Sequence, residues 1–457
     1  MSETKHGPVT FEHISCVPVD PNVFSYSNWG QLVPLTHTNW RDETLSWKEN
    51  CYIHANLSLF PALIVKGPGA ESLLADISVN NYKDWTPGRA KHLIICSHKG
   101  NVIDHGVTMR LADDLFEVWC TPFYTMFKAE EGKYDVDLKL TEGENRNCVF
   151  QLAGPRSLEI VEHATGENMH DLEFMRFRGA KIGSRDVRVL RMGMGGSLSY
   201  EVHCFGDDAG IEVYEELMRV GKDFGITKLG VNQYMCNHTE NGFPQSTFHF
   251  PGGILDEPGY VEYMKHIPDF YYDEAGSVPR GSLSRDIHDY YRNVIELGWE
   301  HMVDFDHEFI GKAALKEIAA NRPRKMVTLV WNHDDLMKVF ASYFEKGEEP
   351  YLDMPFPHDF GMMGPAENNF FQDRVLKDGK QVGVSMWRTY TLYYRETISI
   401  CCIDPELAQV GTQVSLVWGD IGARQLEIRA TVARFPYLDL PRNRDYDLTA
   451  IPAEMGG

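Results

Sequence analysis

Residues 295–315 read IELGWEHMVDFDHEFIGKAAL, and the fold prediction starts from this stretch. Its second half opens a helical pattern, FIGKAALKEIAANRPR, which ends in a proline-containing hinge near residues 322–324. Beyond the hinge the chain changes to apolar runs typical of strands: KMVTLVW, QVGVSMW, TISICCID and QVSLVWGD. We therefore predict a domain boundary near residue 325, with a β-rich domain over 326–457.

Upstream of the boundary, residues 1–325 mix helical and strand patterns and predict an α+β region. A strand, a Gly-Pro turn and a helix follow one another in residues 59–77 (LFPALIVKGPGAESLLADI) and again in 148–166 (CVFQLAGPRSLEIVEHATG). Residues 92–120 predict a β-meander, and 205–225 an amphipathic helix closed by Gly225. The repeated pattern indicates two related, interleaved α+β domains. Helical spacing over 40–56 and long loops over 241–292 complete the prediction.

The composition excludes several classes of partner. The 457 residues carry 66 acidic and 44 basic side chains, a net charge of −22, which repels nucleic acid and anionic membrane surfaces. We expect a cytoplasmic protein, because the first residues lack a signal-peptide pattern, no window would span a membrane, and nine cysteines without CxxC spacing indicate reduced thiols. The 18 histidines show no metal-ligand spacing, so we expect no metal. The oligomeric state is left open.

Two segments carry the polar side chains of greatest interest. In residues 191–206 (RMGMGGSLSYEVHCFG), strand alternation separates Tyr200 from Glu201 and His203. Alternation alone does not decide whether Glu201 meets solvent or a polar cavity. Residues 230–244 (GVNQYMCNHTENGFP) are dense in hydrogen-bonding side chains, and either a binding segment or a helix with Tyr234 capping the core gives this pattern.

With these segments the chain resembles the tetrahydrofolate-dependent aminomethyltransferase family, typified by the T-protein of the glycine cleavage system. The residues that carry the resemblance, from about 35 to 440, are KGPGAESLL, KGNVIDHGVTMRL, FQLAGPRSLEIV, MGGSLSYEVH, GWEHMVDFDHEFIGKAAL, GVSMW and DPELAQVGTQVSLVW. NWRDETLSWKEN and YMCNHTENGF are most similar to the bacterial vanillate and syringate O-demethylases. The resemblance implies an α+β fold of three domains around a central folate cavity, with a C-terminal β-barrel.

The resemblance also implies roles for individual residues. Glu201 matches the glutamate that binds the pteridine N–H groups, a task for which a carboxylate is suited because it accepts two parallel hydrogen bonds. Gln151 and Val118 match positions that line the folate site. Phe243 stands where the O-demethylases have a tryptophan packed on the cofactor, and Tyr234 matches their proposed general acid.

Departures from the family pattern concern the methyl donor. His105 replaces the family's second acidic residue, which weakens the case for aminomethyl chemistry. Leu59 and Cys120 stand where the vanillate-type enzymes have polar or charged side chains, and both make the predicted pocket more apolar. We place these three residues, with His238, on the substrate side.

The sequence therefore predicts an O-demethylase that transfers a methyl group from an aromatic methyl ether to tetrahydrofolate, giving a phenol and 5-methyltetrahydrofolate. A methoxybenzoate, possibly chlorinated as in dicamba, is the expected donor. Two alternatives remain: a sulfonium (dimethylsulfoniopropionate-type) or betaine demethylase on the same fold, and a non-catalytic folate-binding protein.

Overall fold

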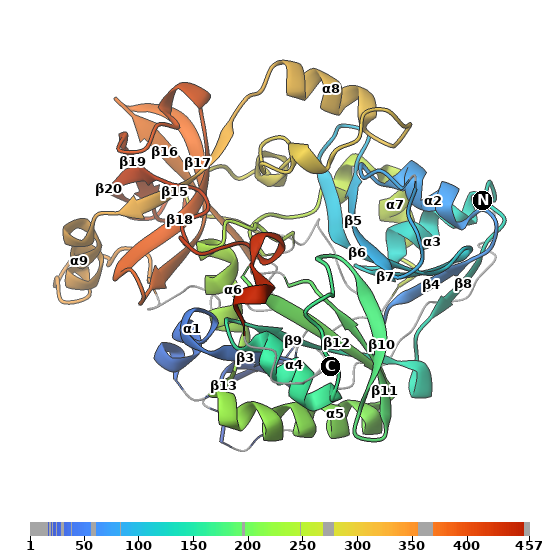
Figure 1. The fold of residues 1–457 in the computed structure, drawn as a ribbon. Coiled ribbons are helices and arrows are strands. Elements are labelled where there is room, and N and C mark those ends of the chain that lie inside the picture. Colours follow the sequence, from blue (N-terminus) through green and yellow to red (C-terminus); the bar gives the residue numbers. More distant parts are fainter. Residues whose placement is uncertain are drawn as a thin grey trace.

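The computed structural model describes most of the chain as three large sheets, one two-stranded sheet and the helices packed against them (Figure 1). The described residues are 17, 20, 22–23, 25–28, 32–37, 39–55, 61–82, 84–193, 197–246, 248–267, 278–354 and 369–451. None of the helices in these ranges is long and apolar enough to cross a membrane.

The first sheet has six strands in the order β10-β11-β12-β9-β3-β13. Its strands are β3 (Cys51–His54), β9 (Asn147–Ala153), β10 (Phe177–Ile182), β11 (Arg185–Leu190), β12 (Ser199–Phe205) and β13 (Ile226–Lys228). Helices α4 (Ser157–Thr165) and α5 (Asp207–Gly221) bury one face, with Phe150 and Val202 of the sheet packed in the same apolar core as Leu158 and Leu217. The predicted helix at 205–225 is thus confirmed, and Gly225 follows it in the left-handed conformation (φ 72°).

The second sheet has five strands in the order β5-β6-β7-β4-β8. They are β4 (Leu63–Lys66), β5 (Arg89–Cys96), β6 (Val102–Ala112), β7 (Leu115–Trp119) and β8 (Asp137–Leu140), so the predicted meander is confirmed as β5-β6-β7. One face packs on α2 (Ala70–Ile77), α3 (Phe123–Glu130) and α7 (Pro258–Met264).

The two sheets share the repeated turn that the sequence indicates. Gly67 follows β4 and Gly154 follows β9, and their φ angles are 131° and 132°. A Cβ atom at either glycine would lie 2.5 Å from a backbone carbonyl oxygen, that of Asp135 or of Asn50. Both turns therefore require glycine for the same physical reason, a positive φ and a close backbone approach.

The C-terminal region forms a closed six-stranded barrel. The strands follow the order β16-β17-β18-β15-β20-β19, and pairing of β16 with β19 closes the ring. They are β15 (Lys325–Trp331), β16 (Asn369–Lys377), β17 (Lys380–Thr391), β18 (Glu396–Ile403), β19 (Gln413–Trp418) and β20 (Leu426–Ala433). The four apolar runs named above became β15, β17, β18 and β19, whereas β16 and β20, which carry more charge, escaped sequence analysis. β14 (Val278–Arg280) adds to β16 in parallel, and α8 (Lys312–Ala320) and α9 (His333–Ser342) flank β15 in the chain.

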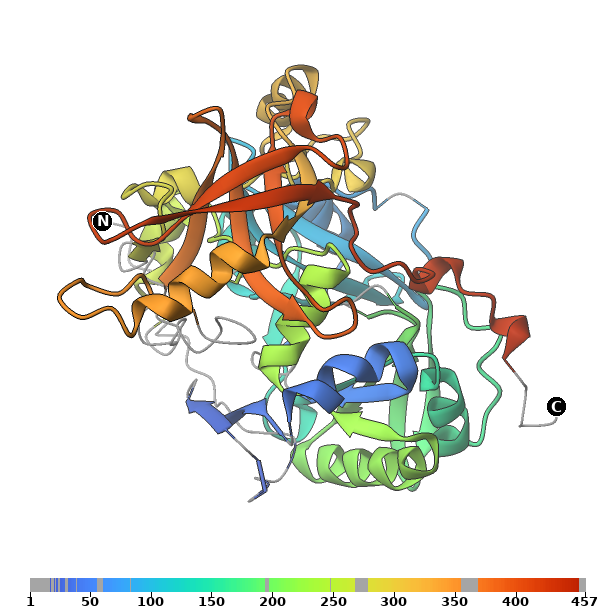
Figure 2. The same ribbon diagram turned by 90° about the vertical axis from the view of Figure 1, so that its left-hand side faces the viewer.

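Helix α6 (Val231–Glu240) lies between the first sheet and the barrel (Figures 1 and 2). It contacts α1 (Trp40–Glu49) and strand β2 (Leu32–Thr36), the partner of β1 (Ser25–Asn28), and on its other side it contacts β17 and β18. Its last residue, Glu240, pairs with Lys48 of α1 at 2.7 Å, and both side chains are almost fully buried. A helix held in this position brings residues of α6 to the centre of the molecule.

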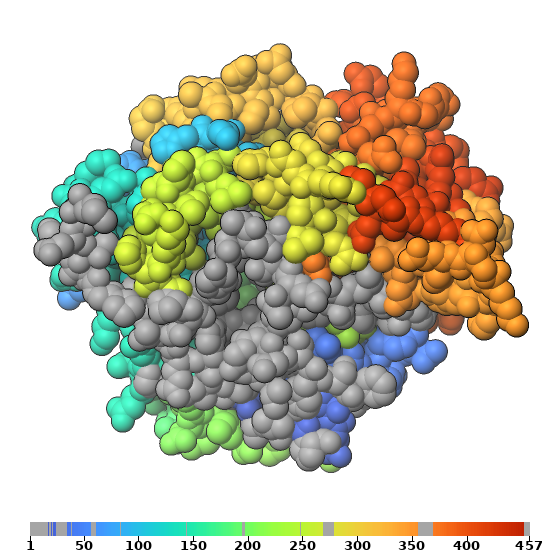
Figure 3. Space-filling model, turned by 180° about the vertical axis from the view of Figure 1, so that it is seen from behind, coloured from blue at the N-terminus to red at the C-terminus, as the bar shows by residue number. Residues whose placement is uncertain are grey.

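Three details of the sequence prediction need correction. The helix in 40–56 ends at Glu49, and residues 51–54 form β3, because CYIH continues into the buried sheet rather than along the helix. The stretch 241–292 is not all loop, because its described residues include α7 and β14; Figure 3 shows residues 248–267 and 278–292, yellow-green to yellow, between the second sheet's elements and the barrel. Seven of the eight described cysteines are free thiols, but Cys148 is disulfide-bonded.

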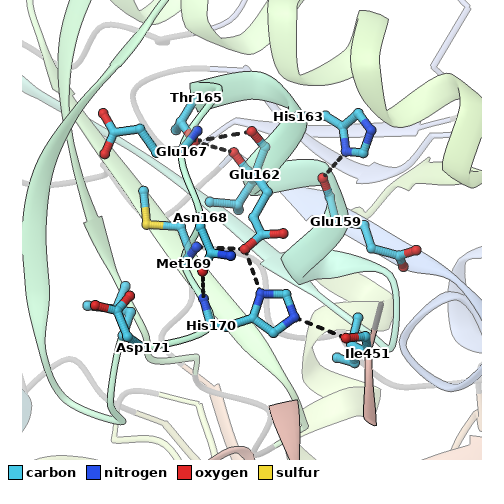
Figure 4. Close-up of polar contacts among 12 residues, drawn as sticks. Glu159, Glu162, His163, Thr165, Glu167, Asn168, Met169, His170, Asp171 and Ile451 are labelled. Atoms are coloured by element: carbon cyan, nitrogen blue, oxygen red, sulfur yellow. Dashed lines mark hydrogen bonds and ion pairs between the residues drawn. The ribbon is translucent and has the colours of Figure 1, made fainter. Parts of the chain in front are cut away.

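The segment after the barrel packs against the core of the first sheet through Leu448 and Ile451, and His170 hydrogen-bonds to it there (Figure 4). His170 Nδ1 lies 2.8 Å from Glu162 Oε1 of α4, and its Nε2 lies 3.1 Å from the carbonyl oxygen of Ile451. Burial works to lower the pKa of His170, but the Ile451 carbonyl and the Glu162 carboxylate outweigh it, and the pKa lies above its ordinary value. The protonated ring donates to both partners at once.

We predict that His170→Gln lowers the free energy of unfolding by about 1 kcal/mol at pH 6 and by less at pH 9. A raised pKa in the folded state means that the stabilisation is complete below the ordinary histidine pKa and is lost as the pH rises through the raised value. Urea titrations at the two pH values measure this, with His333→Gln, whose side chain is 86% exposed, as the control. An equal loss at both pH values would contradict the ion-pair account.

Candidate functional site

Three neighbouring strands of the first sheet place polar side chains in one row. Glu201 of β12 lies opposite Gln151 of β9, and Gln151 lies opposite His54 of β3. Directly opposed residues of antiparallel strands point to the same face, so the three side chains lie side by side. Glu201 is only 5% exposed and His54 only 2%, which places this face inside the protein rather than against solvent.

Hydrogen bonds connect the row. Tyr52, two residues before His54 on β3, donates its hydroxyl to Gln151 Oε1 at 2.6 Å. Gln151 Nε2 donates to Glu201 Oε1 at 3.5 Å, and His203 Nε2 lies 3.4 Å from Glu201 Oε2. Both contacts of the carboxylate are long, so the strongest acceptor in the row keeps lone pairs for a ligand with N–H groups.

Helix α6 brings Tyr234 against this row. Its ring stacks on His54 with centroids 4.1 Å apart, and it meets His238, one turn further along the helix, edge-on at 4.6 Å. The Tyr234 hydroxyl oxygen is buried and has no hydrogen-bond partner among the described residues. Burial raises the pKa of Tyr234 well above its ordinary value, and the nearby Tyr52 and Glu201 add to the rise, so the hydroxyl keeps its proton.

The second sheet contributes two histidines to the site, and Phe243 and Trp299 pack their rings beside them. His105 Nε2 of β6 lies 3.2 Å from His92 Nδ1 of β5. The Phe243 ring lies 5.3 Å from His105 and 6.0 Å from His238, measured between ring centroids, and therefore joins β6 to α6. Trp299, from residues 295–315, stacks on Phe243 with the ring centroids 5.5 Å apart.

The buried histidines of this group are neutral. His54 Nδ1 contacts the Leu229 carbonyl at 3.0 Å and His238 Nδ1 the Phe243 carbonyl at 2.8 Å. A carbonyl only accepts, so each Nδ1 carries the proton and each Nε2 is a bare acceptor. Burial lowers the pKa of both rings to about 4, and it holds the pKa of His105 well below its ordinary value. The site is polar, but the rings of His54, His238 and His105 carry no charge at neutral pH.

The side chains of Asp104 and Cys120 have their partners within the second sheet, where Cys120 packs against the same apolar core as Val118. Asp104 accepts hydrogen bonds from the Thr121 N–H and hydroxyl and from the His105 N–H, and burial raises its pKa to about 7. The Cys120 thiol donates to the Thr121 carbonyl at 3.3 Å, and burial raises its pKa well above the ordinary value. Asp104 therefore connects β6 to the end of β7 and is not free to act on a ligand.

The structure brings most of the predicted site residues together. Ring contacts connect Tyr234, His238, Phe243 and His105, and His54, which stacks on Tyr234, lies opposite Gln151 in the row that ends at Glu201. Val118 is placed differently, because its side chain packs in the apolar core of the second sheet. Its neighbour Trp119 points to the other face and meets the His203 ring edge-on at 5.1 Å. Leu59 lies outside the described residues.

Several members of the group escaped sequence analysis. Tyr52, His54, His92 and Trp299 all contact predicted site residues, and Trp119 contacts His203, the neighbour of Glu201. Tyr52 and His54 could have been found from the period-two pattern in CYIH, had the strand been recognised. His92 gives no local signal, because only the pairing of β5 with β6 sets it beside His105. Among the described residues, no group of three or more histidine, cysteine or acidic side chains could hold a metal ion.

Comparison with known proteins now identifies the family. The model of the GCVT N-terminal domain matches residues 14–247. Sesamin methylene transferase of Sinomonas sp. is 36% identical over 95% of this chain and 96% of its own length. Syringate O-demethylase of Sphingobium sp. is 32% identical over 90% of this chain and 91% of its own.

The chain belongs to the GCVT family. The crystal structure of the glycine cleavage aminomethyltransferase T from Bartonella henselae superimposes with a TM-score of 0.61 over 92% of this chain and 96% of that one, at 14% identity. The predicted T-protein fold with a C-terminal barrel is thereby confirmed. As a GCVT family member the protein is an enzyme of a folate-dependent transferase family, whose acceptor is tetrahydrofolate.

We predict that nuclear magnetic resonance of the imidazole nitrogens will show His54 and His238 as the Nδ1–H tautomer, neutral down to about pH 5. A lowered pKa in the folded state means that the unfolded chain binds more protons between about pH 4 and the ordinary value near 6.5, so stability falls on acidification through that window. Imidazolium signals from either ring at pH 6.5 would contradict this description of the site.

Proposed function

We propose that the protein transfers a methyl group from an aromatic methyl ether to tetrahydrofolate, giving a phenol and 5-methyltetrahydrofolate. The observation that supports this most directly is the buried, unpartnered Tyr234 hydroxyl beside the Glu201–Gln151 row. A neutral proton donor beside a carboxylate that can accept from N–H groups is what this reaction requires.

The residues fit the pteridine part of tetrahydrofolate. Glu201 is a buried carboxylate with only long contacts in the protein, and it suits a ligand edge that presents parallel N–H donors. Gln151 is fixed by Tyr52 and adds an amide that both donates and accepts. Phe243 offers an aromatic face between the two α+β domains. When bound, tetrahydrofolate supplies the nitrogen that accepts the methyl group.

Tyr234 acts as the general acid that protonates the leaving aryl oxygen. As the ether C–O bond breaks, the aryl oxygen gains charge, and Tyr234 donates its proton to that oxygen. In water a tyrosine, with an ordinary pKa of about 10, is closely matched to a phenol, and the match holds in the site when burial raises the pKa of the departing phenol together with that of Tyr234. Because burial raises its pKa further, Tyr234 holds the proton until the aryl oxygen has become basic. Tyr234 then regains a proton equivalent to the one displaced from the nitrogen that would accept the methyl group, so the overall reaction releases none.

The methyl donor is proposed to bind on the side of His105, Cys120 and His238, with Leu59 as a further predicted contact. The relative named syringate O-demethylase supports a methoxyarene as the donor. A methoxybenzoate, possibly chlorinated like dicamba, remains the sequence-based prediction.

A second candidate is transfer of a methylene group. The relative named sesamin methylene transferase, at 36% identity, favours it. Both reactions break a bond from carbon to an aryl oxygen and need the same proton donor, so the product formed on the folate distinguishes them.

We expect 5-methyltetrahydrofolate, measured by mass spectrometry, when the enzyme is incubated with tetrahydrofolate and a panel of methoxybenzoates and methoxyphenols. Tyr234→Phe should lower kcat by about 10²- to 10⁴-fold while folate still binds. A methylenedioxyarene, a sulfonium and a betaine complete the panel.

Each outcome of this screen has its own meaning. A methylene-bearing folate from the methylenedioxyarene would favour the second candidate. Product from the sulfonium or betaine alone, unaffected by Tyr234→Phe, would overturn the aryl ether as donor, because such leaving groups need no acid. Product from no donor, with tetrahydrofolate still bound, would overturn both candidates.

We also expect Glu201→Gln to weaken binding of tetrahydrofolate by about 10- to 100-fold, because the amide replaces one of two charged acceptor oxygens. Calorimetric titration of tetrahydrofolate measures this. Glu212→Gln, which removes a surface carboxylate paired with Arg185, is the matched control and should leave binding unchanged. Equal affinity of the Glu201 variant and the parent would exclude Glu201 from the pteridine site.

A further inference from the structure

One face of helix α6 carries polar atoms that the protein leaves without hydrogen bonds. They belong to Tyr234, Asn237 and His238, at positions i, i+3 and i+4, which share a helical face. The side chains are 4%, 0% and 0% exposed, yet the Tyr234 hydroxyl, both Asn237 amide atoms and His238 Nε2 have no partner among the described residues. Buried polar groups are nearly always paired, so several orphans on one helical turn indicate a missing ligand.

The role of His238 in this group is fixed by its other nitrogen. Nδ1 donates its proton to the Phe243 carbonyl at 2.8 Å, within the tight turn that follows α6. Nε2 therefore presents only a lone pair, and it takes a hydrogen bond solely from a donor. The neighbouring aromatic rings of Tyr234 and Phe243 hold the imidazole in this orientation.

We propose that His238 Nε2 accepts a hydrogen bond from a free hydroxyl group on the methyl donor. The inference rests on the proposed aryl ether chemistry and narrows it to hydroxylated aryl methyl ethers. Tyr234 and His238 lie one helical turn apart with their rings in contact, an arrangement suited to two oxygen substituents of one arene. In this arrangement Tyr234 takes the ether oxygen and His238 the hydroxyl.

The same contact disfavours a negatively charged substituent at this position. A bare imidazole nitrogen repels an anion, and burial lowers the pKa of His238 to about 4, so the ring stays uncharged at neutral pH. Asn237, the third member of the face, is neutral too and both donates and accepts. A carboxylate or a chlorine atom in place of the hydroxyl leaves Nε2 without a donor.

An enzyme that relies on such a contact discriminates strongly between substrates. A site built to bind a hydroxyl rejects the analogue that lacks it, because the buried acceptor then stays unpaired. For this enzyme 2-methoxyphenol should therefore be turned over with a kcat/KM at least about 10-fold above that of methoxybenzene and of 2-methoxybenzoate.

Two variants of His238 distinguish the effect of its hydrogen-bond acceptor from the effect of its side-chain volume. His238→Gln places an amide oxygen close to the position of Nε2, whereas His238→Leu keeps bulk and removes the acceptor, and both lose the bond to the Phe243 carbonyl. We expect the loss of kcat/KM caused by His238→Leu to be about 10- to 100-fold greater for 2-methoxyphenol than for methoxybenzene. His238→Gln should restore much of the loss.

Calorimetric titration of 2-methoxyphenol into the tetrahydrofolate-loaded protein measures the same contact without turnover. Weaker binding to the Leu variant than to the Gln variant, with tetrahydrofolate affinity unchanged in both, would support the proposal. Equal activity or affinity for the hydroxylated and unhydroxylated ethers in the parent enzyme would overturn it while leaving O-demethylation intact. Absence of turnover with every aryl ether would instead overturn the proposed function, and the titration would still report on His238.

Discussion

The hydrogen bond from Tyr52 to Gln151 ties three strands into the row on which the site is built. It joins β3 to β9 at 2.6 Å, and Gln151 continues the connection to Glu201 on β12. A slip of one residue in either pairing would turn Glu201 or His54 to the opposite face, where α4 and α5 pack. The register of these strands therefore decides whether a carboxylate points into the interior or is lost from the site.

A buried carboxylate in such a row is unfavourable unless something binds it. The protein supplies only two long contacts, and the rings of His54 and His238 nearby are uncharged. The protein thus accepts an incompletely satisfied carboxylate at its centre, where low local dielectric strengthens each hydrogen bond that a ligand adds. The same environment keeps the Tyr234 proton in place and the histidines neutral, which suits a transfer between two neutral partners better than a charged site would.

Three parts of the molecule contact helix α6 and thereby fix the position of Tyr234. α1 fixes its end through the Lys48–Glu240 pair, β17 and β18 of the barrel pack on one side, and the row of the first sheet receives Tyr234 on another. The barrel then has a structural part in the site even though the row itself lies in the first sheet. The Phe243 turn at the helix end extends the contact to the second sheet through His105.

The sequence alone determined the α+β region, the meander, the helix at α5 and most of the barrel strands, because each follows from local periodicity and turn chemistry. Resemblance to a family then pointed to Glu201, Gln151, Tyr234 and Phe243, which the fold brings together. Only the tertiary structure decided that Glu201 faces inward, since strand alternation gives the same pattern for solvent and for a cavity. It also added His54 and His92, whose neighbours come from pairings distant in sequence, and it set Val118 in an apolar core. The tautomer of His238 was decided by a backbone carbonyl in the turn after its own helix, a contact that no sequence pattern encodes.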